Sequence, residues 1–110
     1  MANVVRIISF RDAEPFDRGS FGGFKFITAE EQLGFNAIQV EVDGQHGPTE
    51  MKKATRVYFI FDGSGEFTID GKVHEVGDST VIVIPPGSTY DYDGVMSMFE
   101  FNVEPNNDFT

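Results

Sequence analysis

The chain contains no cysteine and no tryptophan among its 110 residues. Without cysteine it has no disulfide framework, no thiolate ligand for a metal and no thiol nucleophile. It also lacks an apolar run near the ~20 residues that span a bilayer, and its first residues, MANVVR, do not begin a signal peptide. We therefore expect a cytoplasmic protein with no membrane partner.

Positive charge is scarce, because 8 Lys and Arg residues face 18 Asp and Glu residues and leave a net charge of -10. The phosphate backbone of a nucleic acid would be repelled, so no nucleic-acid partner is expected. Hydrophobic residues make up 40% of the acidic chain, which is too apolar for a disordered segment. A chain of this length can bury about two thirds of its unfolded surface. We expect one domain over residues 1–110.

Apolar and polar residues alternate over short stretches throughout the chain. This pattern is typical of β-strands, and almost no helical periodicity competes with it. Evenly spaced strands with Gly and Pro between them indicate an all-β sandwich or barrel. The predicted strands cover 4–10, 23–27, 37–42, 56–61, 65–69, 72–76, 80–84 and 95–103.

The turn signals are of unequal strength. Asp70-Gly71 predicts a tight hairpin, because a two-residue type I′ turn needs positive φ at both positions. A Thr followed three residues later by Glu is a capping-box pattern that allows one helical turn. We expect that helical turn over 28–33, further turns at 62–65 and 91–94, and a frayed polar tail over 104–110.

From residue 47 onward the order of features resembles the cupin family of small β-barrels. The resemblance consists of the strand and turn Tyr-Phe-Ile-Phe-Asp-Gly-x-Gly at 58–65, the Asp70-Gly71 hairpin, Gly77-Asp78, and Ile-Pro-Pro-Gly at 84–87. It implies a single-domain jelly-roll barrel in which residues 47–103 form the motif-bearing core. Residues 1–46 would then supply additional N-terminal strands.

The chain departs from the family at the metal-binding positions. Where metal-binding cupins carry His, His, Glu and His, this chain has Glu50, Lys52, Arg56 and Tyr90. Lys and Arg side chains are donors only and would place two positive charges beside an ion. We therefore expect no metal and no other cofactor. An atypical site that uses His46 or His74 stays open, although two distant histidines make no metal signature.

The resemblance leads to a first hypothesis of a small-molecule-binding barrel. If Lys52 and Arg56 face the interior, they replace the charge of the ion and hold a small anionic ligand that bears a carboxylate, sugar or phosphate group. Tyr90 would donate a hydrogen bond from the opposite strand. Tyr58 and Tyr92 complete the expected ligand-binding set.

Two alternatives belong to other functional classes. The chain could be a metal-independent isomerase, epimerase or cyclase, in which Tyr90 acts as acid or base and Glu50 as the opposing base. Two nearby cations would lower the pKa of this tyrosine. It could instead be a structural dimeric barrel in which Glu50 pairs with Lys52 or Arg56. The sequence leaves open whether the chain is an enzyme.

Twelve phenylalanines dominate the aromatic residues. Phe59 and Phe61 lie on the opposite face of their strand from Tyr58 and Ile60, so the strand is apolar on both faces and its outer face needs cover. The N-terminal strands or a second subunit could provide it. Because cupins often dimerise through this surface, the resemblance predicts a homodimer.

Overall fold

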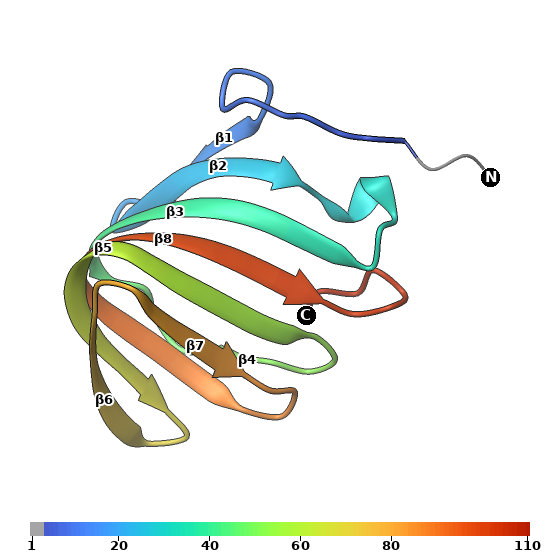
Figure 1. Cartoon of the computed structure of the whole chain (residues 1–110). Coiled ribbons are helices and arrows are strands. Elements are labelled where there is room, and N and C mark those ends of the chain that lie inside the picture. The colour runs from blue at the N-terminus through green and yellow to red at the C-terminus, as the bar shows by residue number, and fades with distance from the viewer. Residues whose placement is uncertain (1–3) are drawn as a thin grey trace.

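The computed structural model describes residues 4–110 and is built almost entirely of strands (Figure 1). This confirms the predicted all-β class. No helix in the described part of the chain is long and apolar enough to cross a membrane. The elements are β1 (Glu14–Asp17), β2 (Phe21–Ile27), the 3-10 turn η1 (Ala29–Glu31), β3 (Phe35–Gln45), β4 (Thr49–Glu50), β5 (Thr55–Ile69), β6 (Lys72–Gly77), β7 (Thr80–Ile84) and β8 (Thr89–Val103).

The strands pair antiparallel in the order β1-β2-β3-β8-β5-β6, with β4 added to β8 and β7 added to β5. The two 15-residue strands, β5 and β8, pair with each other along almost their whole length. The first half of β5 also pairs with β7, and its second half pairs with β6. The sheet therefore folds over itself along β5 and β8 and encloses a core between two layers (Figure 1).

The predicted turns at 62–65 and 91–94 are wrong, because both segments continue inside β5 and β8. Their glycines serve a different purpose, which is the close passage of two bent strands. A Cβ on Gly63 would lie 2.1 Å from the carbonyl oxygen of Val95, and one on Gly94 would lie 2.5 Å from that of Ser64. The glycines thus mark the bend of paired strands and not a chain reversal.

The predicted strand at 4–10 is also absent. Val4, Val5 and Ile7 are 66%, 86% and 93% exposed, and the segment runs along the outside of the barrel (Figure 1). An alternating pattern suits a strand, but a strand also needs a neighbouring edge with which to form hydrogen bonds. Residues 1–3 of the predicted N-terminal region lie outside the described residues.

Two local predictions are confirmed. Asp70 and Gly71 have φ of 49° and 81° and join β5 to β6 in a tight hairpin. Thr28 and Glu31 form the capping box around η1, with the Thr28 backbone N–H donating to the Glu31 carboxylate at 2.8 Å.

Residues 104–110, predicted as a frayed tail, instead fold back onto the barrel. Glu104 is 8% exposed, and Phe109 packs against the core. The Thr110 carbonyl accepts hydrogen bonds from the backbone N–H groups of Lys53 and Ala54, at 2.7 and 3.0 Å. The segment 104–110 is held by loop backbones and side chains and not by strand pairing, so no periodic pattern in the sequence predicts that it is ordered.

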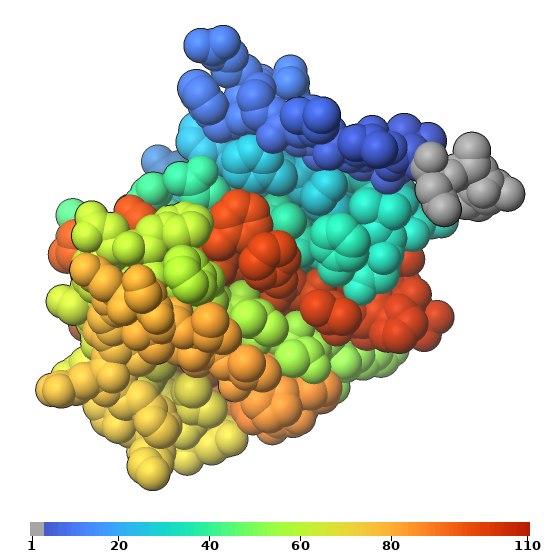
Figure 2. Space-filling model, viewed as in Figure 1, coloured from blue at the N-terminus to red at the C-terminus, as the bar shows by residue number. Residues whose placement is uncertain are grey.

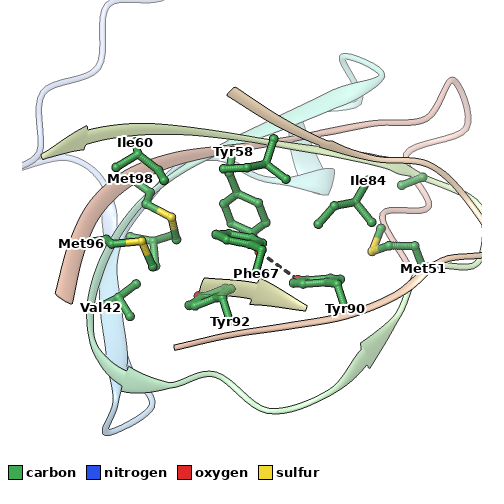
Figure 3. Packing of buried hydrophobic residues seen from close by; sticks show 13 residues of the cluster. Val42, Met51, Tyr58, Ile60, Phe67, Ile84, Tyr90, Tyr92, Met96 and Met98 are labelled. Atoms are coloured by element: carbon green, nitrogen blue, oxygen red, sulfur yellow. Dashed lines mark hydrogen bonds between the residues drawn. The ribbon is translucent and has the colours of Figure 1, made fainter. Parts of the chain in front are cut away.

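Inward-facing side chains of β3, β5, β7 and β8 fill the space between the layers (Figure 3). The largest fully buried side chains of this core are Tyr58, Tyr90, Phe67, Met51, Ile60, Ile84, Met98 and Val40. The outer face stays apolar as well, and Figure 2 shows β8 at the surface between β3 and β5. Its exposed residues include Phe61, Val81, Val83, Phe101 and Val103. The homodimer stays a prediction, with this face as its surface.

Candidate functional site

A cluster of polar side chains interrupts the apolar core at one end. Strand register places it, because Asn36 of β3, Asn102 of β8 and Arg56 of β5 are direct neighbours across three strands. Glu100 occupies the adjacent row, beside Tyr58. Residues two apart share a face of a strand, so all of these side chains point into the barrel.

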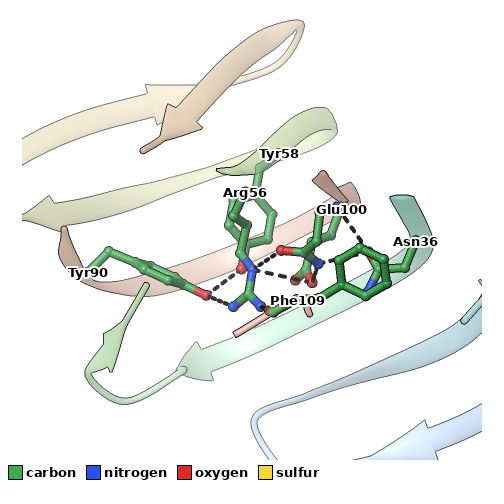
Figure 4. A network of polar contacts seen from close by, with 7 residues as sticks. Asn36, Arg56, Tyr58, Tyr90, Glu100 and Phe109 are labelled. Atoms are coloured by element: carbon green, nitrogen blue, oxygen red, sulfur yellow. Dashed lines mark hydrogen bonds and ion pairs between the residues drawn. The ribbon is translucent and has the colours of Figure 1, made fainter. Parts of the chain in front are cut away.

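Hydrogen bonds join the cluster into one network (Figure 4). The Arg56 Nε donates to Asn102 Oδ1 at 2.5 Å and lies 3.6 Å from Glu100 Oε2. Asn102 Nδ2 donates to Glu100 Oε2 and to Asn36 Oδ1, each at 2.8 Å. The side chains of Arg56 and Glu100 are only 15% and 11% exposed. The pair is therefore almost desolvated and neutral overall, unlike the cationic pocket predicted from the sequence.

The guanidinium also holds a pair of tyrosines. Arg56 Nη1 donates to Tyr90 Oη at 2.5 Å, and the hydroxyls of Tyr90 and Tyr58 lie 2.8 Å apart. The Tyr92 ring lies behind them, with its centroid 5.0 Å from that of Phe67. Because Tyr90 Oη accepts a hydrogen bond from Arg56, its own hydrogen is available to Tyr58 or to a ligand.

The environment keeps these groups in their ordinary protonation states. Burial raises the pKa of Tyr58 and Tyr92 well above the usual value, and it raises the pKa of Tyr90 despite the opposing effect of Arg56. The predicted lowering of the Tyr90 pKa is therefore wrong, since desolvation outweighs the nearby cation. Burial lowers the pKa of Arg56, but Glu100 and the tyrosines raise it by more, so the net pKa lies above its usual value and the guanidinium stays charged. All three hydroxyls are donors at neutral pH.

Alkaline titration should show this directly. We expect no tyrosinate absorbance from the folded protein at or just above pH 10, the ordinary tyrosine pKa. A group whose pKa is raised by folding stabilises the folded state below its unfolded pKa, and this stabilisation is lost as the pH rises. Tyrosine ionisation should thus coincide with the loss of the circular dichroism signal of the sheet. Tyrosinate in a protein that keeps its native spectrum near pH 10 would contradict this.

The structure brings together Arg56, Tyr58, Tyr90 and Tyr92 from the predicted set, but not Glu50 or Lys52. Both of these residues are exposed. They flank Met51, which is 1% exposed and occupies the inward position. Because neighbouring residues of an extended segment face opposite sides, the predicted inward register is wrong for Glu50 and Lys52. The carboxylate that pairs with Arg56 is Glu100 and not Glu50.

The two histidines lie apart. The His46 ring lies 4.5 Å from the Tyr92 ring and 5.7 Å from the Tyr90 ring, while His74 is exposed on β6. His46 Nδ1 is 2.8 Å from the Gly47 carbonyl oxygen. An acceptor there places the hydrogen on Nδ1 and leaves Nε2 as the acceptor of the neutral ring.

The donor set at the centre of the barrel does not suit the metal that many cupins hold. The Arg56 guanidinium occupies the middle of the network, and it can only donate hydrogen bonds. Glu50, the one carboxylate at the family's ligand positions, faces solvent. Across residues 4–110 no three His, Asp or Glu side chains are grouped as metal ligands.

A pocket of about 340 Å³ opens beside the polar cluster, between β1, β2, β3 and the C-terminal segment. Asn36 belongs to both the pocket and the cluster, so the pocket borders the polar network that contains Arg56. Glu14 and Lys25, which face each other across β1 and β2, line it with Phe109. We call this pocket the mouth of the barrel.

Sequence reasoning missed Glu100, Asn102 and Asn36. A usable signal existed in β8, where Met96 and Met98 share the parity of Glu100 and Asn102. Polar residues on the same strand face as buried apolar residues indicate a polar cluster inside the core. Asn36 gave no comparable signal, since it stands beside a turn.

No family model and no curated protein matches this sequence. Solved structures do match in fold. Pac13 of Streptomyces, described as a nucleoside dehydratase, is 16% identical over 92% of this chain and 83% of its own, with a TM-score of 0.82. KdgF of Halomonas is 11% identical over 97% and 100%, with a TM-score of 0.80. The cupin domain of Cnp3 of Schizosaccharomyces pombe is 15% identical over 87% and 72%, with a TM-score of 0.74.

These similarities show that the chain has the cupin fold, which confirms the resemblance seen in the sequence. Three of the Pac13 structures contain uridine and carry single substitutions, of a histidine by glutamine or of a tyrosine by phenylalanine. At these identities the comparisons carry the fold alone.

Proposed function

We propose that this cupin barrel binds a small, oxygen-rich organic molecule at Arg56, which the ligand reaches through the mouth. The proposal depends on the weakest hydrogen bond that Arg56 makes. Arg56 Nη2 meets the carbonyl of Phe109 at 3.4 Å, whereas its Nε and Nη1 make bonds of 2.5 Å. A ligand oxygen at a normal distance of about 2.9 Å would be a better acceptor.

The charges favour a hydroxyl, carbonyl or single carboxyl group over a polyanion. Glu100 already balances Arg56, and the mouth adds Glu14 and Glu30 against one Lys25. A multiply charged anion would enter a site with more carboxylates than cations. Phe109 and Ile38 offer apolar contact beside these polar groups. We therefore replace the sequence hypothesis of an anionic ligand held by Lys52 and Arg56 with that of a hydroxylated ligand held by Arg56 without Lys52.

A catalytic role is the second candidate, and the position of Tyr90 favours it. Tyr90 is positioned by the hydrogen bond from Arg56 and is kept protonated by burial, which suits a general acid. Glu50 is exposed, so the base role passes to His46, whose ring lies beside that of Tyr90. In an elimination, His46 Nε2 would take a proton from a carbon next to a carbonyl group, a carbon–carbon double bond would form, and the departing hydroxyl would take the Tyr90 proton and leave as water. The activity described for Pac13 belongs to this reaction class.

Thermal shift and calorimetry with uridine and with citrate test the binding proposal. We expect uridine, a neutral hydroxylated probe, to stabilise the protein more than citrate does. Arg56→Lys keeps the charge but loses the planar fork, so the affinity should fall about tenfold, as expected for one charged hydrogen bond of ~1.5 kcal/mol. Lys52→Ala is the matched control and should bind as the wild type does. Stabilisation by citrate alone, or an unchanged affinity for uridine in Arg56→Lys, would contradict the proposal.

A derivative of uridine with a carbonyl group on its sugar tests the catalytic candidate, because the carbonyl acidifies the neighbouring C–H. Loss of one water from this derivative in the presence of the wild type, followed by mass spectrometry, should disappear in Tyr90→Phe and in His46→Gln while binding persists. Binding with no conversion would leave a binding module. Conversion that continues in Tyr90→Phe would remove this tyrosine from the mechanism.

A further inference from the structure

The segment after β8 begins with a compact folded turn. The buried carboxylate of Glu104 accepts the backbone N–H groups of Asn106 and Asp108, at 2.7 and 3.2 Å. Asn107 Oδ1 accepts the Gly34 N–H at 2.7 Å, and Glu104 N–H donates to the Gly34 carbonyl at 2.9 Å. This turn is thereby fixed to the loop that precedes β3.

The far end of the segment is fixed to a different loop. The Thr110 carbonyl accepts the backbone N–H groups of Lys53 and Ala54. The Lys53 ammonium lies 3.1 Å from the Asp108 carboxylate at the surface. The Thr110 hydroxyl and the Lys53 ammonium hold the pKa of Asp108 well below its usual range, at about 2, so this ion pair persists at neutral pH.

Between these two attachments the segment contributes one wall of the mouth through Phe109. Phe109 lines the pocket and lies in front of the polar network in Figure 4. Its backbone carbonyl accepts the long hydrogen bond of 3.4 Å from Arg56 Nη2. Phe109 is also the only apolar side chain of residues 104–110 that packs against the core. A segment with so few buried apolar contacts is one that opens locally without unfolding the rest.

We infer that residues 104–110 form a strap that closes the mouth over Arg56 and opens to admit the ligand, the Phe109 carbonyl occupying the place of a ligand oxygen while the strap is closed. This inference rests on the proposed function for the role of the ligand. The closed strap itself is a property of the chain, and it can be tested without any ligand. Opening breaks the Lys53–Asp108 ion pair and the two backbone bonds to Thr110, and it leaves the barrel strands intact.

Chemical modification of arginine by phenylglyoxal, located by peptide mass spectrometry, measures access to Arg56. In the wild type Arg56 should react much more slowly than the exposed Arg18, which serves as an internal reference. Phe109→Ala removes the cover and Asp108→Asn weakens the far attachment. Each should accelerate the reaction of Arg56 severalfold and leave that of Arg18 unchanged. Asp78→Asn, at an exposed aspartate in the turn between β6 and β7, is the matched control and should change neither rate.

Hydrogen exchange provides a second measurement, because the amides of Lys53 and Ala54 donate to the strap. They should exchange faster in Asp108→Asn, while the central amides of β8 keep their protection. If Phe109→Ala loses its native circular dichroism, Asp108→Asn decides alone. Unchanged reactivity of Arg56 in a folded Asp108→Asn variant, with unchanged exchange at Lys53 and Ala54, would overturn the strap. If Arg56 reacts faster in Asp108→Asn than in the wild type, but the protein binds neither uridine nor citrate, the proposed function is wrong and the strap is supported.

Discussion

Gly63→Ala is expected to destabilise the barrel by about 2–5 kcal/mol, which is a large share of the stability of a domain of this size. The new Cβ would lie 2.1 Å from the Val95 carbonyl oxygen and 2.9 Å from the Met96 Cα, and both atoms are backbone. A rigid backbone cannot move aside as a side chain can, so β5 and β8 would have to separate at their bend. Crowding of this kind costs about 1–3 kcal/mol, to which the φ of +99° adds about 1–2 kcal/mol.

Gly71→Ala separates these two contributions. Gly71 has a φ of +81°, but a Cβ there would meet nothing within 4 Å. Only the backbone term applies, so we expect a loss of about 1–2 kcal/mol. Urea unfolding of both variants, followed by circular dichroism, measures the difference. Equal losses would show that the close passage of β5 and β8 does not matter to stability.

Arg56→Met is expected to cost about 2–4 kcal/mol, although it adds an apolar side chain to the interior. It leaves the carboxylate of Glu100, 11% exposed, without its cation. Breaking a buried pair by removing one partner costs about 3–5 kcal/mol, and the residual exposure of this pair reduces that figure. Glu100→Met should be similarly costly, because it strands the guanidinium.

The double variant Arg56→Met with Glu100→Met should recover most of this loss. Two apolar side chains in place of a desolvated ion pair are often neutral or stabilising. A double-mutant cycle by urea unfolding gives the coupling between the two positions. Additive losses would mean that the pair is screened by solvent, and that the network of Figure 4 contributes little to the fold.

The fold could be predicted as far as local signals reach. The Asp70-Gly71 hairpin and the capping box at Thr28 depend on residues close in sequence, and both are confirmed. The bend at Gly63 could not be recognised, because its cause is Val95, on a strand that follows much later. A glycine needed for a close approach and a glycine needed for a turn look the same in one sequence.

The site was predictable where the motif positions fell inside long strands. Arg56 and Tyr90 lie in β5 and β8, whose register is fixed by many pairs, and both point inward as predicted. Glu50 stands at the end of the two-residue strand β4, where the inward position passes to Met51. The motif pattern of the family placed the carboxylate partner of Arg56 at Glu50. The partner is instead Glu100, which shares the inward face of β8 with Met96 and Met98.

The position of β8 has a consequence for how the chain folds. Within residues 4–110, β3 pairs only with β2 and β8, and it makes no ladder with β5. Before residues 89–103 are in place, the described part of the chain can form only two separate units, which are the meander β1-β2-β3 and the strand β5 with β6 and β7 paired to its two halves. Joining the two units requires contacts across most of the sequence. Folding should therefore be slow for a chain of this length, with the docking of β8 as the step that commits both halves to one sheet.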